Sequence, residues 1–357
     1  MQNPFTTTFS KAPEYTYIHT PQSKEIIENF SYQTPSESVY KITGVRGSGK
    51  TVILAKVEEA LSSEEFEKDG WLVYRLSPAR DMLKQLASQL AKSGFLKEEV
   101  KSRSINLSAT VLGTGGTIGF SSEKTDNLFD IGSEIDTMLE KASVKGKKIL
   151  IGVDEVSRTQ DMVIFASEFG KWLRAGYPVY LVCTGLYENI QEISNVKNLT
   201  FFRRATTIKT GPLSAVAMSE IYHNKLGVDY GTAKQLSSLT KGYAYAFQEL
   251  GVLYFRKEEY QTTEEILEQL QIELFSYSYE KIWDELSDND QLFVKTLVPQ
   301  KEYNREEILS TLGEKAGIYS VYRDRLLKRG IVTTKNARLS IALPFFDTFI
   351  ERYCMEA

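Results

Sequence analysis

The sequence predicts an α/β protein built around a buried parallel sheet, and three segments carry this prediction. Residues 38–44 (SVYKITG) form a short β-branched and aromatic run, followed by a glycine-rich turn and by an apolar periodicity typical of a helix over 50–63. Residues 147–155 (KKILIGVDE) and 177–185 (YPVYLVCTG) each contain a continuous apolar run. A continuous run of this kind is typical of a parallel strand that is buried on both faces.

Composition and charge exclude several classes of protein. The 357 residues suffice for two or three domains, and the formal net charge of −4 limits any nucleic-acid contact to a local patch. Cys183 and Cys354 form no CxxC pair, which argues against a zinc site or a disulfide framework and favours a reducing cytoplasm. The only histidines are His19 and His223, so neither a histidine metal centre nor a Ser–His–Asp triad is expected. No secretory signal and no membrane span are expected either, and no membrane partner is predicted.

Residues 44–51 (GVRGSGKT) carry the strongest functional signal, because they match the pattern G-x-x-x-x-G-K-[ST] between a predicted strand and a predicted helix. Backbone N–H groups of such a loop and the positive end of the helix dipole can surround a triphosphate, and glycines let the backbone approach closely. The lysine can reach the β- and γ-phosphates, and the threonine hydroxyl can bind Mg²⁺. A chance glycine turn before a helix is the alternative. The predicted cofactors are ATP and Mg²⁺, and the predicted contacts are Gly44, Gly47, Ser48, Gly49, Lys50, Thr51 and Val52.

The run at 147–155 ends in two acidic residues that suit the chemistry of a bound triphosphate. Asp154 would lie at the carboxyl edge of its strand, where open α/β sheets bind ligands, and would hold Mg²⁺ together with Thr51. Glu155 is the natural candidate to orient or activate the attacking water, with Lys50 as its catalytic partner on the phosphates. The alternative is that Asp154 caps the next helix.

Three further residues are candidates for catalytic roles. Thr184 follows the strand at 179–183 and could contact the γ-phosphate or the attacking water, although it could also cap the following helix. Arg203 and Arg204 precede another β-branched run and could stabilise transition-state charge, including in a neighbouring subunit. A solvated basic pair is the equally weighted alternative for the two arginines.

The remaining chain divides into an arm, an insertion, a lid and a tail. Residues 1–24 are expected to form an extended arm, and 71–78 (WLVYRLSP) a second strand followed by an amphipathic helix. The glycine-rich stretch 104–126 does not fit GxGxxG and predicts an inserted β-hairpin. A helical lid is expected from Ser214 to Arg256, followed by a further helical stretch.

Residues 285–357 predict a winged helix: three helices followed by two short strands about a Lys335–Asn336 turn. Asn304 and Glu307 form a capping-box signature at the start of the second helix. The third helix carries a basic stripe with interleaved tyrosines, as phosphate contacts to duplex DNA require. A protein contact or a solvated face is the alternative to DNA binding. The basic residues of this stripe are Arg323, Arg325, Lys328 and Arg329.

The order of these motifs resembles the AAA+ and STAND-like branch of P-loop ATPases, and in particular the archaeal-type ATPase family. The motifs are GVRGSGKT (44–51), ILIGVDE (149–155), LVCTG (181–185), FFRRA (201–205) and GPLS (211–214). The resemblance covers roughly residues 25–255, with a similar tail beyond. It implies a P-loop NTPase sheet sandwiched by helices in the strand order 5-1-4-3-2, with a small helical lid.

The segment 239–251 (LTKGYAYAFQELG) departs from this family picture. AAA+ members use a lid arginine to sense the γ-phosphate, and this segment has none. It is more similar to the G-x-P-x-A segment of STAND proteins, with Ala244 at the proline position and Lys241 offset from the sensing position. The arginine that STAND proteins carry after the fourth strand is also absent from 183–186 (CTGL). Both departures favour a slow nucleotide-driven switch over a fast motor.

The sequence therefore predicts an arm (1–24), an ATPase core (25–213), a lid and linker (214–284) and a winged-helix domain (285–357). The main functional hypothesis is a Mg²⁺-dependent ATPase whose nucleotide state moves the winged helix. The alternative is a DNA-associated regulator in which ATP is mainly structural. A protein partner of the winged helix and an ATP-dependent homo-oligomer are further possibilities.

Overall fold

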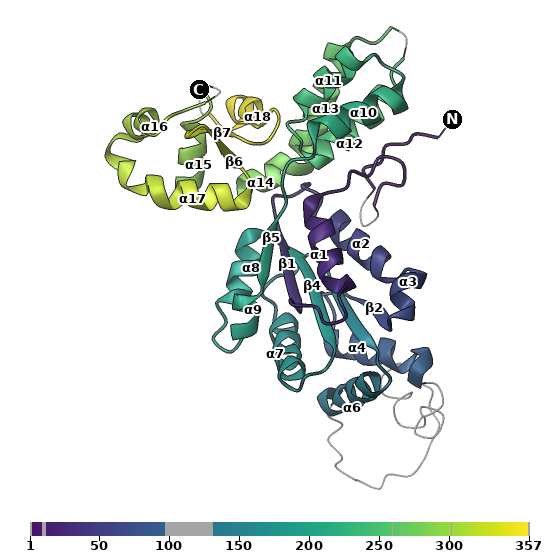
Figure 1. The fold of residues 1–357 in the computed structure, drawn as a ribbon. Helices are drawn as coiled ribbons and strands as arrows, with labels where there is room; N and C mark the ends of the chain where they lie inside the picture. The colour runs from purple at the N-terminus through teal and green to yellow at the C-terminus, as the bar shows by residue number, and fades with distance from the viewer. Residues whose placement is uncertain (1, 9–11, 97–130, 259, 301, 356–357) are drawn as a thin grey trace, which may run out of the picture. The chain divides into compact units, whose positions relative to one another are not determined.

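The computed structural model describes residues 2–8, 12–96, 131–258, 260–300 and 302–355 (Figure 1). The chain forms two compact units. The first comprises Met1–Glu25, Ile42–Ala55 and Ile208–Ala357, and the second comprises Ile26–Lys41 and Lys56–Thr207. The hairpin predicted for 104–126 lies outside the described residues.

A five-stranded sheet is the framework of the fold, in the order β2-β3-β4-β1-β5. From the β5 edge this is the order 5-1-4-3-2 that the resemblance implied. The central strands β3 and β4 are parallel and almost wholly buried, which explains their continuous apolar runs. Their carboxyl ends therefore lie at the same edge of the sheet. The strands are β1 (Val39–Thr43), β2 (Trp71–Leu76), β3 (Lys148–Val153), β4 (Val179–Gly185) and β5 (Thr206–Lys209).

The second unit packs its helices on this sheet around a core rich in aromatic side chains, including the fully buried Phe165, Phe169, Trp172 and Phe202. Thr159 caps α7 by accepting a hydrogen bond from the Met162 amide. Asp154 is therefore not the cap of the helix that follows β3, and that alternative was wrong. The helices are α3 (Glu64–Lys68), α4 (Met82–Ala91), η1 (Gly94–Leu96), α6 (Ile131–Val144), α7 (Gln160–Arg174), α8 (Tyr187–Ser194) and α9 (Thr200–Arg204).

Two helices cross the boundary between the units. Helix α1 (Pro21–Ser31) begins inside the segment that was expected to be an extended arm. Helix α2 (Lys50–Leu61) follows the glycine-rich loop, as the pattern predicted.

Cys183 is buried in β4, and burial raises the pKa of its thiol to about 12. Both cysteines are free.

The first unit contains the predicted lid, which is helical as expected. Ser214 caps the first lid helix and Gly227 ends it in the left-handed region, where a glycine is favoured. A short π-helical turn, η2 (Phe275–Tyr279), joins the last two helices. The helices are α10 (Ala215–Leu226), α11 (Tyr230–Leu239), α12 (Ala244–Phe255), α13 (Thr263–Leu274) and α14 (Glu280–Asp284).

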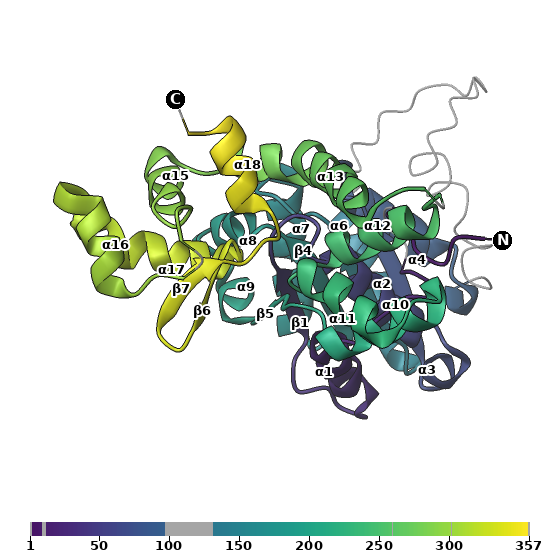
Figure 2. The same cartoon turned by 90° about the horizontal axis from the view of Figure 1, so that it is seen from above.

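The tail has the element order predicted for a winged helix, and its assignment as one stays a prediction. The predicted capping box of Asn304 and Glu307 is present at the start of the second tail helix. The hairpin lies beside α17 (Figure 2) and turns at Asn336 and Ala337, one position later than expected, with both residues at positive φ. The elements are α15 (Asp288–Lys295), α16 (Arg305–Leu312), η3 (Gly313–Ile318), α17 (Tyr319–Arg329), β6 (Val332–Lys335), β7 (Arg338–Ile341) and α18 (Phe346–Tyr353). Among the described residues, no helix has the length and apolar character needed to cross a bilayer.

Candidate nucleotide site

The glycine-rich loop lies in the first unit and makes a tight turn into α2. Gly47 (φ +73°) and Gly49 (φ +89°) adopt the left-handed backbone region that glycine tolerates best. The Lys50 ammonium donates hydrogen bonds to the carbonyl oxygens of Gly44 (3.1 Å) and Val45 (3.0 Å). The lysine thus lies against its own loop, which is the position from which an ammonium group can neutralise an anion held there.

Two tyrosines at the start of the lid helix α12 hold the loop in place. The Tyr243 hydroxyl donates to the Arg46 carbonyl (2.6 Å) and shares a hydrogen bond with the Ser278 hydroxyl (2.8 Å). The Tyr245 amide donates to the Gly47 carbonyl (3.1 Å). A Cβ atom at Gly47 would lie 2.2 Å from the Tyr243 hydroxyl oxygen, so close packing as well as backbone conformation requires glycine there. Burial raises the pKa of Tyr243, which keeps the phenol protonated as a donor.

These tyrosines were missed by the sequence analysis, which examined their segment for an arginine. Lys241, the offset candidate in that segment, donates instead to the carbonyl oxygens of Ile341 and Leu343 in the tail (3.3 Å each). The signal that could have found them is the presence of two tyrosines within three residues after Gly242, at the beginning of a helix. Their contacts place the lid on the loop without a charged side chain.

The second unit brings together three of the predicted site residues at the carboxyl ends of β3 and β4. The buried Thr184 hydroxyl donates to the Asp154 carboxylate and accepts a hydrogen bond from the Glu155 amide (3.0 Å). The amide after Glu155, that of Val156, donates to the Thr184 carbonyl (2.8 Å). The cap of α8 is Leu186, so Thr184 does not serve as the cap of that helix. Thr184 therefore orients both acidic residues.

Glu155 has an unusual backbone conformation for its residue type. Its φ is +54°, in the left-handed region that a residue with a side chain adopts only at a cost of roughly 1–3 kcal/mol. The hydrogen bonds to Thr184 hold it there. The Glu155 side chain is exposed, whereas Thr184 is buried. A strained, exposed carboxylate beside a buried orienting hydroxyl is typical of a site that performs chemistry.

Comparison with solved structures gives the fold a wider context. A Walker-type ATPase of Pyrococcus abyssi matches with a TM-score of 0.60 and 12% identity, over 95% of this chain and 97% of that one. The chain therefore shares the fold of this Walker-type ATPase. No protein-family model and no curated protein matches the sequence.

Two proteins of Aeropyrum pernix are also similar to this chain, at lower scores. The ORC2 protein, solved as ADPNP–ADP complexes, has a TM-score of 0.49 and 12% identity, over 92% of this chain and 91% of that one. The ORC1 protein, solved in complex with DNA, has a TM-score of 0.47 and 14% identity, over 95% of this chain and 96% of that one.

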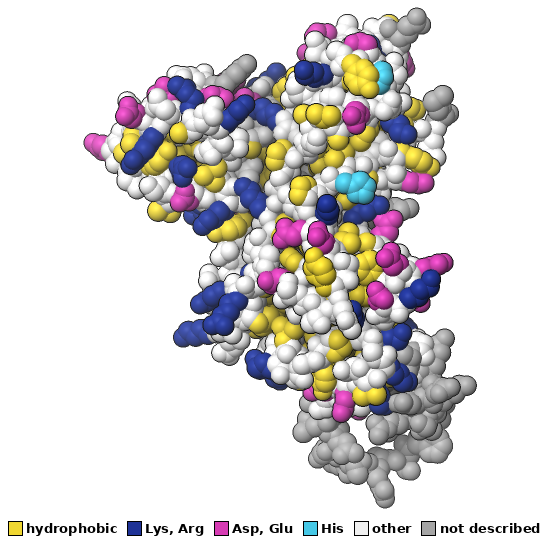
Figure 3. All heavy atoms as spheres, viewed as in Figure 1, with side chains coloured by type: hydrophobic (Ala, Val, Ile, Leu, Met, Phe, Trp, Pro, Cys, Tyr) yellow, Lys and Arg dark blue, Asp and Glu magenta, His cyan; other side chains and the backbone are white. Residues whose placement is uncertain are grey.

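The two candidate arginines lie on the short helix α9 in the second unit. Both side chains are exposed, and the Arg203 Nε donates to the Ser194 carbonyl (3.1 Å). The buried Lys41 ammonium donates to the Phe202 carbonyl (2.6 Å) and so anchors the same helix. Figure 3 shows Lys and Arg side chains gathered over the α8–α9 segment, where Lys197 is also exposed. Arg204 and Arg203 are thus accessible to a molecule outside the chain.

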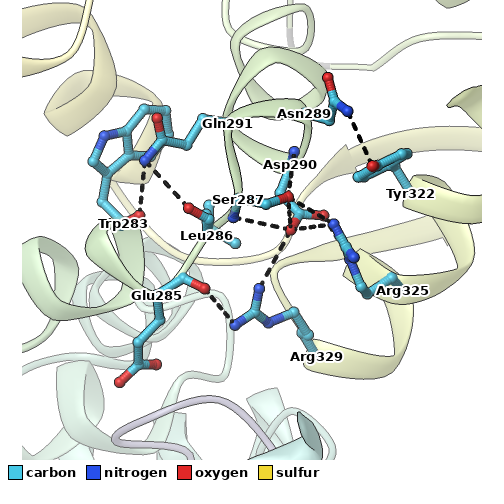
Figure 4. Close-up of polar contacts among 10 residues, drawn as sticks. All are labelled: Trp283, Glu285, Leu286, Ser287, Asn289, Asp290, Gln291, Tyr322, Arg325 and Arg329. Atoms are coloured by element: carbon cyan, nitrogen blue, oxygen red, sulfur yellow. Dashed lines mark hydrogen bonds and ion pairs between the residues drawn. The ribbon is translucent and has the colours of Figure 1, made fainter.

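The basic stripe of α17 is used largely inside the tail, which corrects the prediction for two of its four residues (Figure 4). The Arg325 guanidinium pairs with the buried Asp290 carboxylate (2.5 Å) and stacks on Tyr322. Arg329 is only 9% exposed, contacts Asp290 at 3.6 Å and donates to the Glu285 carbonyl (3.0 Å). Arg329 is buried and Arg325 is held by a buried carboxylate, so neither guanidinium group is readily available to DNA phosphates.

A cavity of about 910 Å³ within the first unit adjoins the loop. Val45 and Ser48 line it together with 210–212, 238–239, 241–244 and residues of the β6–β7 hairpin of the tail. The Ser48 hydroxyl accepts a hydrogen bond from the Thr210 hydroxyl (2.9 Å), which fixes this wall. A volume of this size is within the range of cofactor and ligand sites. Loop, lid and tail therefore line a common cavity that is open to solvent.

Proposed function

We propose that this protein binds ATP with Mg²⁺, hydrolyses it slowly, and uses the nucleotide state to reposition its tail. The observation that carries the proposal is that the single hydroxyl of Thr184 orients both Asp154 and Glu155. In the same chain, the glycine loop leads directly into α2, which begins at Lys50. The similarity in fold to a Walker-type ATPase supports the proposal. The cytoplasmic location and the domain boundaries remain part of the proposal.

The residues present suit a magnesium nucleotide. Mg²⁺ prefers oxygen ligands, and Asp154 offers a carboxylate that is held at a strand end by Thr184. Thr51 offers a hydroxyl in the first turn of α2. When bound, Mg²⁺ would neutralise part of the charge of the phosphates. The proposed phosphate contacts are Lys50 and the backbone of Gly44, Gly47, Ser48, Gly49, Thr51 and Val52.

In the proposed hydrolysis, Glu155 accepts a proton from the attacking water as the water oxygen bonds to the γ-phosphorus. The bond between the γ-phosphorus and the β–γ bridging oxygen breaks, which leaves ADP and phosphate. Thr184 holds Glu155 in place through its backbone amide. Arg203 or Arg204 would stabilise the developing charge in a neighbouring copy, because both are exposed on α9.

A chain of contacts within the first unit supports the switch. The Arg46 guanidinium in the loop pairs with the Glu285 carboxylate at 2.9 Å, and the Glu285 carbonyl accepts a hydrogen bond from Arg329 of α17. Phosphates bound by the loop would attract Arg46 and compete with Glu285 for it. The alternative of a DNA-associated regulator has less support, because Arg325 and Arg329 are engaged with Asp290.

Calorimetry with ATP and ADP tests the binding. We expect the wild-type protein to bind ADP more tightly with Mg²⁺ present, and Lys50→Ala to weaken binding by about 10- to 100-fold, since a charge-assisted hydrogen bond contributes roughly 1.5–3 kcal/mol. Lys56→Ala is the matched control, because that lysine lies on the same helix and pairs with Glu59. Folded wild-type protein that shows no binding of either nucleotide would refute the proposal.

Hydrogen exchange of the tail amides tests the switch. Because exposed ion pairs contribute roughly 0.2–1 kcal/mol, Glu285→Gln is expected to speed exchange in 319–343 by about two- to fivefold without nucleotide. ADP with Mg²⁺ should produce a change in the same direction in the wild type. Glu280→Gln, at an exposed position of α14, the helix that Glu285 caps, should leave exchange unchanged. If nucleotide binds but tail exchange does not respond, the switch is wrong although the binding stands.

A further inference from the structure

Glu58 is a buried carboxylate that neither the motif nor the proposed chemistry uses. It lies on α2 about two turns after Thr51, and residues so spaced share one face of a helix. The residue is only 4% exposed. Helical glutamates are ordinarily solvated, so the burial of this one calls for a specific partner.

The partner surface is strand β3, which has a glycine where the carboxylate lies. A Cβ atom at Gly152 would be 2.0 Å from the Glu58 Oε1 atom, so no other residue fits there without moving the carboxylate. Gly152 is the last residue but one of β3, and Asp154 directly follows the strand, two positions later in the chain. Glu58 thus packs against the carboxyl end of β3, which leads directly to the proposed magnesium ligand.

A cation at the neighbouring strand balances Glu58. Arg75 of β2 is paired in register with Gly152, and its Nε contacts the Glu58 Oε2 atom at 2.6 Å. Burial raises the pKa of Glu58, Arg75 lowers it and the charge of Asp154 raises it. The two carboxylates therefore interact and repel each other. If the ion pair of Glu58 and Arg75 served only to join α2 to the sheet, it would not need the Asp154 carboxylate nearby.

We propose that Glu58 is a positioning residue that raises the affinity of Asp154 for Mg²⁺, with Arg75 partly cancelling its charge. A second negative charge near the ion stabilises it by Coulomb attraction without coordinating it, and a buried charge is less screened than an exposed one. This inference rests on the proposed function, because it assumes that Asp154 holds the magnesium ion of a nucleotide.

Two substitutions of opposite sign test the role. Equilibrium titrations of a fluorescent ADP analogue at constant ionic strength give the Mg²⁺ concentration that half-saturates the magnesium-dependent binding. Glu58→Gln is expected to raise this concentration by about three- to tenfold, because it removes the attracting charge. Arg75→Gln is expected to lower it by about two- to threefold, because it leaves Glu58 uncompensated. Arg75 is 67% exposed, so its replacement leaves no cavity in the core.

Glu59→Gln is the control, since Glu59 is the adjacent carboxylate and is 65% exposed. It should leave the Mg²⁺ requirement unchanged. The pair of Glu58 and Arg75 is only structural if Glu58→Gln and Arg75→Gln both fold and both keep the wild-type Mg²⁺ requirement. The same conclusion follows if both variants shift that requirement in the same direction. Wild-type protein that binds the analogue equally with and without Mg²⁺, or fails to bind it, would refute the magnesium site itself and not merely the role of Glu58.

Discussion

Replacing Glu155 with glutamine is expected to lower steady-state ATP turnover by about 10²- to 10³-fold while ATP binding persists, since a positioned general base contributes a factor of this order. Glutamine keeps the size of the side chain and the left-handed backbone with φ +54° that Thr184 holds through its hydroxyl. Its amide cannot accept the proton of the attacking water. The loss therefore falls on the chemical step, with kcat reduced and nucleotide affinity little changed.

Phosphate release measures turnover, and calorimetry on the same preparation measures binding. Asp161→Asn is the matched control, because Asp161 is an exposed acid in the first turn of α7. It should retain wild-type turnover. Full activity in Glu155→Gln would show that another group activates the water, and equal losses in both variants would point to a general effect of charge.

The sheet could be predicted because its strands are short, buried and locally encoded. Lys148–Val153 and Val179–Gly185 are almost wholly buried, so nearly every position must be apolar or small, and the pattern is visible without any tertiary information. The glycine loop is equally local, since positive φ at Gly47 and Gly49 and a following helix belong to one short segment. The capping box at Asn304 and Glu307 is also a local signal.

The parts that could not be predicted depend on contacts between distant segments. Asp290 and Arg325 are separated by 35 positions, and nothing in α17 itself distinguishes a guanidinium that pairs internally from one that faces solvent. The burial of Glu58 depends on Gly152 of another element. Tyr243 was missed because its role is a hydrogen bond to a backbone carbonyl 197 positions away. Polar side chains are ambiguous in sequence, because partners decide whether they are buried.

Replacing Asp290 with alanine is expected to destabilise the tail by about 3–5 kcal/mol, since removal of one partner from a buried ion pair leaves the other charge uncompensated. The Asp290 side chain is 1% exposed and accepts hydrogen bonds from Arg325 and Ser287. It also contacts Arg329, which is itself 9% exposed. The same carboxylate completes the capping box of α15, so its loss removes a helix cap as well.

Urea denaturation followed by the fluorescence of Trp283 measures this loss of stability. The other two tryptophans are replaced by phenylalanine in every variant, so that Trp283 alone gives the signal. Trp283 reports on this region because its carbonyl accepts a hydrogen bond from the side-chain amide of Gln291, the residue after Asp290. Asp324→Ala is the control. It breaks the ion pair between Asp324 and Arg323 on α17, and the Asp324 side chain is 59% exposed. That change should cost less than about 1 kcal/mol. Equal midpoints for the two variants would mean that Arg325 and Arg329 do not depend on Asp290. The arginines would then be free to act on an external anion, and the duplex-DNA hypothesis for α17 would regain the support that the buried ion pairs remove.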